Sequence, residues 1–253
     1  MKLVCFDLEG PLSPQDNAYE VMGLVPDGYK IFEVISRYDD LLALEGREDY
    51  EPGDTLKLIV PFLLYHGISS ASIRGVSQRA GLVEGAAELV ARLKAEGWKV
   101  YIVSTSYEQH ALSIGQRVGV PRENIFCTAF PLDALRQGAK GEERSQLAEC
   151  TRYIVDELYA ESLGEGGKDH LLKPYLDWFY WDKLPQTSLG TLGESMSVLG
   201  GRRKLWAIER IARKLDCFLE QLCFVGDSIT DAQAAKVIEA MGGIAIAFNG
   251  NNF

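Results

Sequence analysis

Two stretches decide the fold of this chain: Phe6-Asp7-Leu8-Glu9-Gly10 near the N-terminus and Phe224-Val225-Gly226-Asp227-Ser228-Ile229-Thr230-Asp231 near the C-terminus. A short apolar run leads into each of them, Lys2-Leu3-Val4-Cys5-Phe6 and Gln221-Leu222-Cys223-Phe224-Val225. Such runs predict buried strands of a parallel sheet. Acidic residues at the carboxyl ends of two such strands lie where open α/β folds bind ligands. Carboxylates gathered there repel one another unless a hard cation lies between them. The two stretches therefore predict a magnesium site built around a nucleophilic aspartate.

The composition narrows the function classes. The chain has 253 residues, of which 26 are basic and 36 acidic, for a formal charge of -10. The length suits one large domain, or a core with a smaller inserted one. No Lys/Arg-rich stretch offers a footprint for nucleic acid, so we expect no such partner. The apolar runs are shorter than a membrane span, and no signal segment precedes the first strand. We therefore expect no membrane insertion and a cytoplasmic location.

Cysteine and histidine patterns give little sign of metal or thiol chemistry. The five cysteines form no C-x-x-C pair and no zinc-like spacing. Cys5 and Cys223 lie inside predicted strands, where small buried hydrophobes are expected. No paired histidine motif supports a cysteine nucleophile. His66, His110 and His170 are scattered along the chain, and each is expected at an exposed or cap position.

Strand and helix signals alternate at both ends of the chain and break down in between. Residues from about 17 to 81 are mainly helical in pattern, with no strand among them. The core pattern then resumes in the order helix 85–94, strand 98–104, helix 108–118 and strand 124–127, which is typical of parallel crossover units. From 133 to 200 the pattern is helical again, apart from a glycine-rich break at 164–167. A helix at 204–214 and strands before Gly226 and at 243–248 complete the core.

These signals predict an α/β protein with a parallel sheet. We expect a core made of residues 1–12, 82–132 and 200–253. A first helical insertion covers residues 13–81, and a second insertion or enlarged loop covers 133–199.

Asp7 and Glu9 are the candidate catalytic pair. The Asp7 carboxylate can accept a phosphoryl group as an aspartyl-phosphate, which splits one hard displacement into two. The alternative is an aspartate that ends a strand and caps a turn. Glu9 lies on the same face of an extended segment. Its longer side chain could protonate the leaving oxygen and then activate water, although it could also be a solvated turn residue.

Asp227 is the candidate metal ligand, together with Asp7 and the main-chain carbonyl of Glu9. Magnesium normally keeps water and substrate oxygens in its remaining positions. Gly226 lets the backbone approach a ligand closely, and Asp231 is expected to orient the metal ligands through a hydrogen-bonding contact. Alternatively, Asp227 simply caps the next helix.

A phosphate-binding group is predicted from two further places. Ser104 ends the middle strand, and its hydroxyl, Thr105 and the neighbouring amides could cradle phosphate oxygens; helix capping is a compatible alternative. Lys204 lies where a helix begins and could neutralise charge on the transferring group and on the nucleophile. Arg202 and Arg203 compete for that role, and a solvated lysine is the simpler interpretation.

As a set, these motifs resemble the haloacid dehalogenase-like superfamily of phosphatases: Asp7-x-Glu9, Ser104, Lys204 and Gly226-Asp227-x-x-x-Asp231. The resemblance implies a Rossmann-like core, an aspartyl-phosphate mechanism and Mg²⁺. The first insertion occupies the place of the helical cap in phosphoserine phosphatase-like members. The resemblance assigns the nucleophile to Asp7, the acid/base to Glu9, phosphate contacts to Ser104 and Lys204, and metal ligation to Asp7, Glu9 and Asp227. The superfamily usually has Asp where Glu9 stands.

A narrower resemblance is to a largely archaeal group, some of whose members are labelled as the R subunit of energy-converting hydrogenase A. It rests on Glu9-Gly10-Pro11-x-Ser13-x-x-Asp16-Asn17-Ala18, Tyr38-Asp39-Asp40, Gly53-Asp54-Thr55-Leu56-Lys57-Leu58 and Val103-Ser104-Thr105-Ser106-Tyr107-Glu108-Gln109. The second insertion also carries an aromatic cluster, Tyr175, Trp178, Phe179, Tyr180 and Trp181. Packing against the core explains such a cluster, and a surface for a protein partner is the alternative.

The sequence therefore predicts a Mg²⁺-dependent phosphomonoester hydrolase acting on a small phosphorylated metabolite. Two alternatives stay open at this point. One is a non-catalytic or regulatory subunit that keeps the fold and binds a protein partner, and the other is a phosphotransferase that passes the phosphoryl group to an alcohol.

Overall fold

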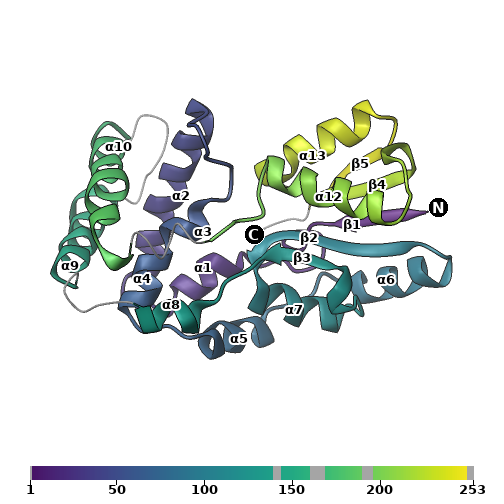
Figure 1. Cartoon of the computed structure of the whole chain (residues 1–253). Helices are drawn as coiled ribbons and strands as arrows, with labels where there is room; N and C mark the ends of the chain where they lie inside the picture. The colour runs from purple at the N-terminus through teal and green to yellow at the C-terminus, as the bar shows by residue number, and fades with distance from the viewer. Residues whose placement is uncertain (1, 139–143, 160–168, 190–195, 250–253) are drawn as a thin grey trace. The chain divides into compact units, whose positions relative to one another are not determined.

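The computed structural model describes residues 2–138, 144–159, 169–189 and 196–249. The chain divides into two compact units (Figure 1). The first unit comprises Met1–Asn17, Ile73–Phe130 and Val198–Phe253, and the second comprises Ala18–Ser72 and Pro131–Ser197. Both expected insertions thus contribute mainly to the second unit. Their exact boundaries stay a prediction, and the glycine-rich break at 164–167 lies outside the described residues.

The described part of the first unit contains a five-stranded parallel sheet in the order β3-β2-β1-β4-β5. The strands are β1 Leu3–Phe6, β2 Lys99–Tyr107, β3 Ile125–Thr128, β4 Leu222–Gly226 and β5 Ile244–Ala247. Phe6 at the end of β1 pairs with Ile102 of β2 and with Val225 of β4. The carboxyl ends of β1 and β4 therefore lie side by side, and the predicted α/β fold is confirmed.

Helices cover both faces of this sheet (Figure 1). Leu3 and Cys5 pack with α12 (Arg202–Lys214) and α13 (Ile229–Ala240). Val4 and Phe6 point to the opposite face, where they pack with α6 (Ala86–Ala95) and α7 (Glu108–Arg117). Alternate residues of β1 thus enter separate cores, which explains why the whole strand is apolar. Each fully buried side chain of this kind contributes about 1.5–3 kcal/mol.

The middle strand β2 is longer than the sequence indicates. The prediction that it ends at Ser104 is wrong, because pairing continues to Tyr107. The register against β3 shifts between Val103 and Tyr107. Residues 104–106 are all polar, so the apolar pattern that predicts a strand stops before the strand does. As a consequence, Ser104 and Ser106 alternate with Thr105 along an extended segment.

The second unit is helical in its described residues. Its helices, with those that cross into the first unit, are α1 Asn17–Met22, α2 Gly28–Glu45, α3 Thr55–Leu58, α4 Val60–Tyr65, α5 Ser70–Arg79, α8 Leu132–Gly138, α9 Arg144–Tyr153 and α10 Asp169–Asp177. π-Helical turns continue α9 as η3, Ile154–Leu158, and α10 as η4, Trp178–Lys183. A short 3-10 turn, η5 Leu184–Gln186, also lies in this unit, whereas η1 Arg122–Asn124 and η6 Leu219–Gln221 lie in the first unit.

Polar and aromatic contacts join α2 to the α10–η4 segment. The Arg37 guanidinium donates to the Asp169 carboxylate at 2.6 and 3.1 Å. The Tyr38 hydroxyl donates to Asp177 at 2.6 Å and accepts from the Trp181 indole N–H at 2.7 Å. Tyr180 stacks on Tyr38 with ring centroids 5.9 Å apart. These contacts of the aromatic cluster lie within the second unit, while Trp178 is about half exposed, at 47%.

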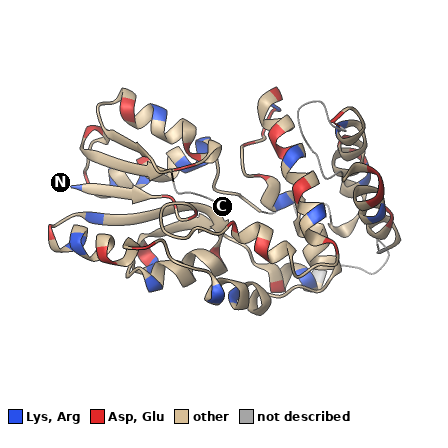
Figure 2. Cartoon of the chain, turned by 180° about the vertical axis from the view of Figure 1, so that it is seen from behind, with Lys and Arg blue, Asp and Glu red and all other residues tan. Residues whose placement is uncertain are grey.

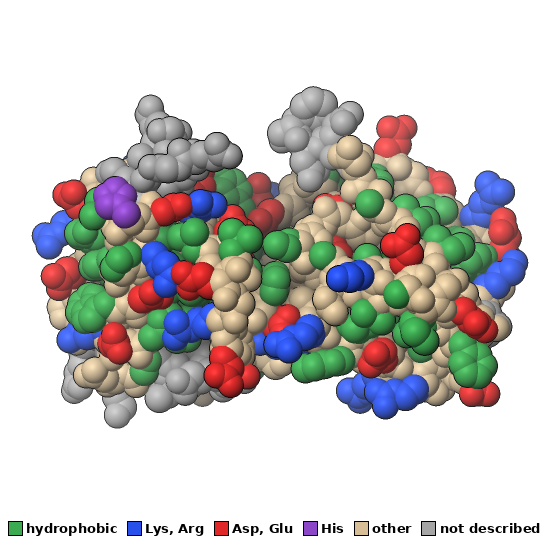
Figure 3. Space-filling model, turned by 90° about the horizontal axis from the view of Figure 1, so that it is seen from above, with side chains coloured by type: hydrophobic (Ala, Val, Ile, Leu, Met, Phe, Trp, Pro, Cys, Tyr) green, Lys and Arg blue, Asp and Glu red, His purple; other side chains and the backbone are tan. Residues whose placement is uncertain are grey.

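Two cysteines lie where the sequence predicts them, whereas one histidine does not. Cys5 and Cys223 are buried, as expected, but His110 is fully buried in α7, so its expected exposed or cap position is wrong. Basic and acidic positions are both spread over the helices (Figure 2). On the face in Figure 3, basic, acidic and hydrophobic side chains are interspersed among the described residues. None of the described helices is individually long and apolar enough to cross a membrane; Thr55–Tyr65 and Ser70–Arg79 reach that length and composition only together, across a bend of 116°.

Candidate active site

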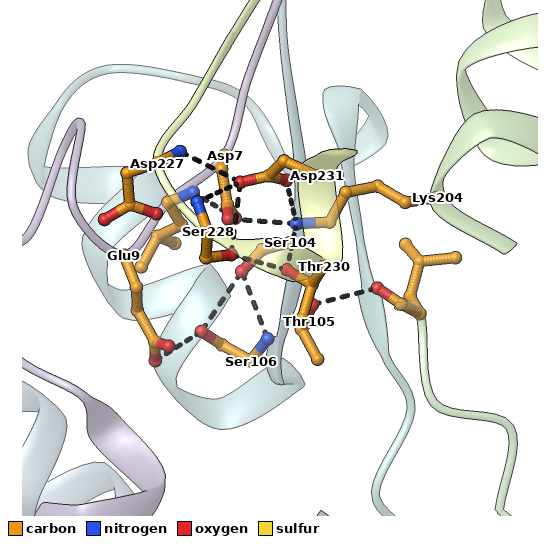
Figure 4. A network of polar contacts seen from close by, with 12 residues as sticks. Asp7, Glu9, Ser104, Thr105, Ser106, Lys204, Asp227, Ser228, Thr230 and Asp231 are labelled. Atoms are coloured by element: carbon orange, nitrogen blue, oxygen red, sulfur yellow. Dashed lines mark hydrogen bonds and ion pairs between the residues drawn. The ribbon is translucent and has the colours of Figure 1, made fainter. Parts of the chain in front are cut away.

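Asp7 is the first residue after β1, and the chain holds it tightly. Its N–H donates to the carbonyl of Val225 at 2.8 Å, which extends the β1–β4 pairing by one step. The side chain is buried, with 4% of the residue exposed. Oδ1 accepts the N–H of Leu8 at 2.6 Å, and Oδ2 accepts from Nζ of Lys204 at 2.9 Å (Figure 4). The carboxylate therefore has a fixed orientation at the sheet's carboxyl edge.

Lys204 supplies a buried positive charge beside Asp7. It lies in the first turn of α12 and is completely buried. Its Nζ also lies 2.5 Å from Oδ1 of Asp231 and 3.3 Å from the hydroxyl of Thr230. A buried ammonium needs such partners, because removing it from water costs several kcal/mol. The neighbouring Arg203 instead donates to the carbonyl of Val198 at 3.1 Å, so Lys204 is the base that faces Asp7.

The pKa values of these groups reflect two effects, burial and the charges of neighbouring side chains. Burial raises the pKa of Asp7 to about 7, although the Lys204 ammonium opposes the rise. Burial acts to lower the pKa of Lys204, but the charges of Asp7 and Asp231 outweigh it and raise the value to about 12. Burial and the Asp231 charge raise the pKa of Asp227 to about 6. Lys204 thus stays cationic among carboxylates that are crowded together.

Asp231 orders the loop between β4 and α13. Its Oδ2 accepts the N–H groups of Asp227 at 3.0 Å and Ser228 at 3.2 Å. Ser228 is the N-cap of α13, and Asp231 is the third residue of that helix, so the pair forms a reciprocal capping arrangement. A Cβ on Gly226 would lie 2.5 Å from Oδ2 of Asp231. Glycine is therefore required for this turn to close over the carboxylate.

Gly10 brings the main chain after Glu9 against Asp227. Its φ of 82° belongs to the left-handed region that favours glycine. A Cβ at this position would lie 2.0 Å from Oδ2 of Asp227. The two sequence-distant motifs therefore touch at these residues. The close approach explains why a glycine follows the first acidic pair.

The donor set suits a hard divalent cation. Asp7, Asp227 and Asp231 each offer a carboxylate oxygen, and these oxygens lie within 4.8 Å of one another. Asp227 is exposed while the other two are buried, so one side of the group is open. Carboxylate oxygens with room for water are the ligands that Mg²⁺ prefers. Asp7 and Asp227 are the residues that would hold the ion, since Asp231 is engaged with Lys204 and two backbone N–H groups.

Glu9 points to the serines of β2. Its Oε1 accepts the Ser106 hydroxyl at 2.7 Å and the N–H of Asn17 at 3.1 Å (Figure 4). Burial, followed by the charge of Asp16, raises the pKa of Glu9 to about 8, against the effect of the Ser106 bond. The side chain is held beside the predicted nucleophile and can keep a proton at neutral pH.

Ser104 and Thr105 have different environments. Ser104 is buried, and its hydroxyl donates to that of Ser106 at 3.1 Å. Thr105 points the other way and donates to the carbonyl of Leu199 at 3.1 Å. The Thr128 hydroxyl donates to the carbonyl of Thr105 at 2.6 Å and accepts the N–H of Leu199 at 3.0 Å. The hydroxyl of Thr105 thus holds the segment that leads to Lys204, and the phosphate contact expected of Thr105 stays a prediction.

The structure brings together Asp7, Glu9, Ser104, Lys204, Asp227 and Asp231, whereas Thr105 faces away (Figure 4). Sequence reasoning missed Ser106 and Thr128. The alternation of Ser104 and Ser106 is the available signal for Ser106, because residues two apart on a strand share a face. Thr128 had no comparable signal, since its hydroxyl serves backbone groups far away in the sequence.

Comparison with known proteins gives structural matches only. No protein-family model matches the chain, and no curated protein matches it either. The gene product AF1437 from Archaeoglobus fulgidus is similar over 99% of this chain and 74% of its own, with 27% identity and a TM-score of 0.79. A phosphoserine phosphatase solved as a phospho-aspartyl intermediate analogue matches over 97% of this chain and 92% of its own, with 17% identity and a TM-score of 0.57.

A HAD family hydrolase from Salmonella enterica serovar Typhi is similar at 13% identity, with a TM-score of 0.57, over 99% of this chain and 69% of its own. The narrower resemblance to hydrogenase A subunit R proteins stays a prediction. The parallel sheet order and these matches agree on the architecture. The chain therefore has the haloacid dehalogenase-like fold, in the form shared by phosphoserine phosphatases.

Proposed function

We propose that the chain is a phosphomonoester hydrolase that acts through an aspartyl-phosphate on Asp7. The observation that carries this proposal is the buried contact of the Asp7 carboxylate with Lys204, next to Asp227 and Asp231. A protein that only binds a partner has no need for a buried ammonium among carboxylates, an arrangement that is costly in stability unless every contact is made. The phospho-aspartyl analogue named for one similar phosphatase supports the same chemistry.

The positions of these side chains support a displacement on Asp7 as the first half-reaction. An oxygen of Asp7 attacks phosphorus, and the bond from phosphorus to the leaving oxygen breaks. Glu9 gives its proton to that oxygen, which departs as an alcohol. Lys204 holds the attacking carboxylate in place and offsets negative charge on the phosphoryl group, while the Ser104 hydroxyl, which is hydrogen-bonded to Ser106 beside Glu9, binds a phosphoryl oxygen.

The second half-reaction regenerates the protein. Water attacks the phosphorus of the aspartyl-phosphate, Glu9 takes its proton, and the bond to Asp7 breaks to release inorganic phosphate. Mg²⁺ held by Asp7 and Asp227 would supply positive charge to the phosphoryl oxygens. We propose a small phosphorylated metabolite as the substrate.

The test measures phosphate release from p-nitrophenyl phosphate with and without Mg²⁺. The native chain should turn over only with the metal, and Asp7→Asn should lose at least about a hundredfold in kcat, because loss of a nucleophile removes the covalent step. Asp216→Asn, an exposed position, is the matched control and should keep full activity. Equal turnover of the native chain and Asp7→Asn would refute the proposal.

A further inference from the structure

Ser106 has no role in the proposed reaction, yet it is buried and hydrogen-bonded to both Glu9 and Ser104. It is 3% exposed and lies in β2, two residues after Ser104. Its hydroxyl donates to Oε1 of Glu9 at 2.7 Å, across 97 positions of sequence. A hydroxyl carries a single proton, so this bond commits the Ser106 donor to Glu9.

Both hydrogen bonds that the described residues donate to the Glu9 carboxylate reach the same oxygen. Oε1 accepts from the Ser106 hydroxyl and from the N–H of Asn17, at 2.7 and 3.1 Å. Among the described residues, Oε2 accepts no hydrogen bond. One oxygen is therefore held by the protein, while the other is left to carry a proton.

A glutamate needs such holding more than an aspartate does. Its additional methylene adds a rotatable bond, and fixing a glutamate side chain costs up to about 2 kcal/mol of conformational entropy. A proton donor works only within hydrogen-bond reach of the atom that receives the proton. A contact that fixes Glu9 before the substrate arrives thus removes this cost from the reaction.

Ser106 also connects Glu9 to the predicted phosphate contact. The Ser104 hydroxyl donates to Oγ of Ser106 at 3.1 Å, and the N–H of Ser106 donates back to Oγ of Ser104 at 3.1 Å (Figure 4). The hydrogen bonds from Ser104 to Ser106 and from Ser106 to Glu9 thus link the predicted phosphate contact to the predicted proton donor. A phosphoryl oxygen that takes the Ser104 proton leaves the Ser106 bond to Glu9 intact.

We propose that Ser106 is a positioning residue, which holds Oε1 of Glu9 so that Oε2 exchanges the proton with the leaving oxygen and then with water. This inference rests on the function proposed above. Its consequence depends on the leaving group. Phenolate is a much stronger base than p-nitrophenolate, so its departure depends more on a well-placed acid.

The experiment compares kcat/KM of Ser106→Ala for phenyl phosphate and p-nitrophenyl phosphate. The loss should be at least about tenfold greater for phenyl phosphate, as a fraction of the 10²–10⁴-fold typical of acid catalysis. Ser106→Thr keeps the hydroxyl, so its ratio of kcat/KM for the two substrates should be close to that of the native chain. Because both substrates are assayed on one preparation, the ratio does not depend on how much of the variant is folded.

An equal loss on both substrates, or no loss, overturns the role of Ser106. The role of Ser106 is also overturned if Ser106→Thr has the same ratio of kcat/KM for the two substrates as Ser106→Ala. Asp7→Asn, assayed alongside, separates the two claims. If it stays active, the proposed hydrolase mechanism fails; if it is inactive and the Ser106 ratio is unchanged, only the positioning role fails.

Discussion

Nζ of Lys204 lies 2.9 Å from Oδ2 of Asp7, a residue 197 positions earlier in the chain. The strand order explains how they meet. β1 lies between β2 and β4, and α12 packs on the face of the sheet that Leu3 and Cys5 share. The helix that carries Lys204 therefore begins above the end of the strand that carries Asp7. The contact couples the stability of the core to the proposed chemistry.

Replacing Lys204 by methionine should lower the free energy of unfolding by about 3–5 kcal/mol, because Asp7 and Asp231 would be left buried without their cation. Urea denaturation measures the loss. Lys214→Met, at the exposed end of the same helix, should change stability by less than about 0.5 kcal/mol. Similar losses of unfolding free energy in both variants would mean that buried Lys204 contributes no more stability than an exposed lysine.

Gly10→Ala should damage both stability and turnover. The added methyl would lie 2.0 Å from Oδ2 of Asp227, in a backbone conformation with φ of 82°. Gly97→Ala is the matched control, since its φ is 85° and nothing lies within 4 Å of the added methyl. Both variants should lose about 1–2 kcal/mol from the left-handed backbone. Phosphate release should fall in Gly10→Ala alone; normal turnover there would contradict the close approach of the two motifs.

Asp227→Asn should weaken Mg²⁺ binding without unfolding the protein. A cation that binds the native state raises stability by about 2.7 kcal/mol at a hundred times its Kd. Thermal unfolding followed across a Mg²⁺ titration should show that rise in the native chain and much less of it in the variant. Asp216→Asn should behave as the native chain does. An unchanged Mg²⁺ response in Asp227→Asn would exclude this carboxylate as a ligand.

His110 should make the protein less stable in mild acid. Burial, aided by the charge of Arg117, lowers the pKa of His110 from 6.5 to about 4 in the folded state. Between these values the unfolded chain binds more protons than the native one, so stability present above pH 6.5 is lost as the pH falls towards 4. The full effect is about 3 kcal/mol.

Urea denaturation at pH 7 and pH 5 checks this dependence. His110→Leu should lose less stability than the native chain over that interval, whereas the same change at the exposed His170 should leave the native dependence in place. A pH dependence that survives in His110→Leu would assign the acid sensitivity to other groups.

The sequence was sufficient wherever a local pattern carried the information. Apolar runs that end in acidic residues predicted β1, β4 and the meeting of Asp7 with Asp227, because parallel strands share a carboxyl edge. The end of β2 was missed, since residues 104–106 are polar while the strand continues through them. Local polarity competes there with long-range pairing, which no window of sequence contains.

Contacts between distant side chains were beyond this approach. The bond from Ser106 to Glu9 and the one from Thr105 to Leu199 each join segments about 95 positions apart. The contacts of Arg37 and Tyr38 with α10 likewise join the two helical insertions. A helical pattern shows which face is apolar, but not which other helix that face meets. The same limit applied to His110, whose burial is set by its neighbours in the core.

The central position of β1 also affects how the chain folds during its synthesis. Of the five described strands, β1 is made before the others, whereas its neighbour β4 and the second acidic motif are made only after residue 221. Until then Asp7 lacks Asp227 and Asp231, and the flank of β1 that pairs with β4 has unpaired backbone groups that favour aggregation. A chain interrupted before β4 therefore has neither the acidic group around Asp7 nor the pairing of β1 with β4, and it should expose apolar strand residues that chaperones and proteases recognise.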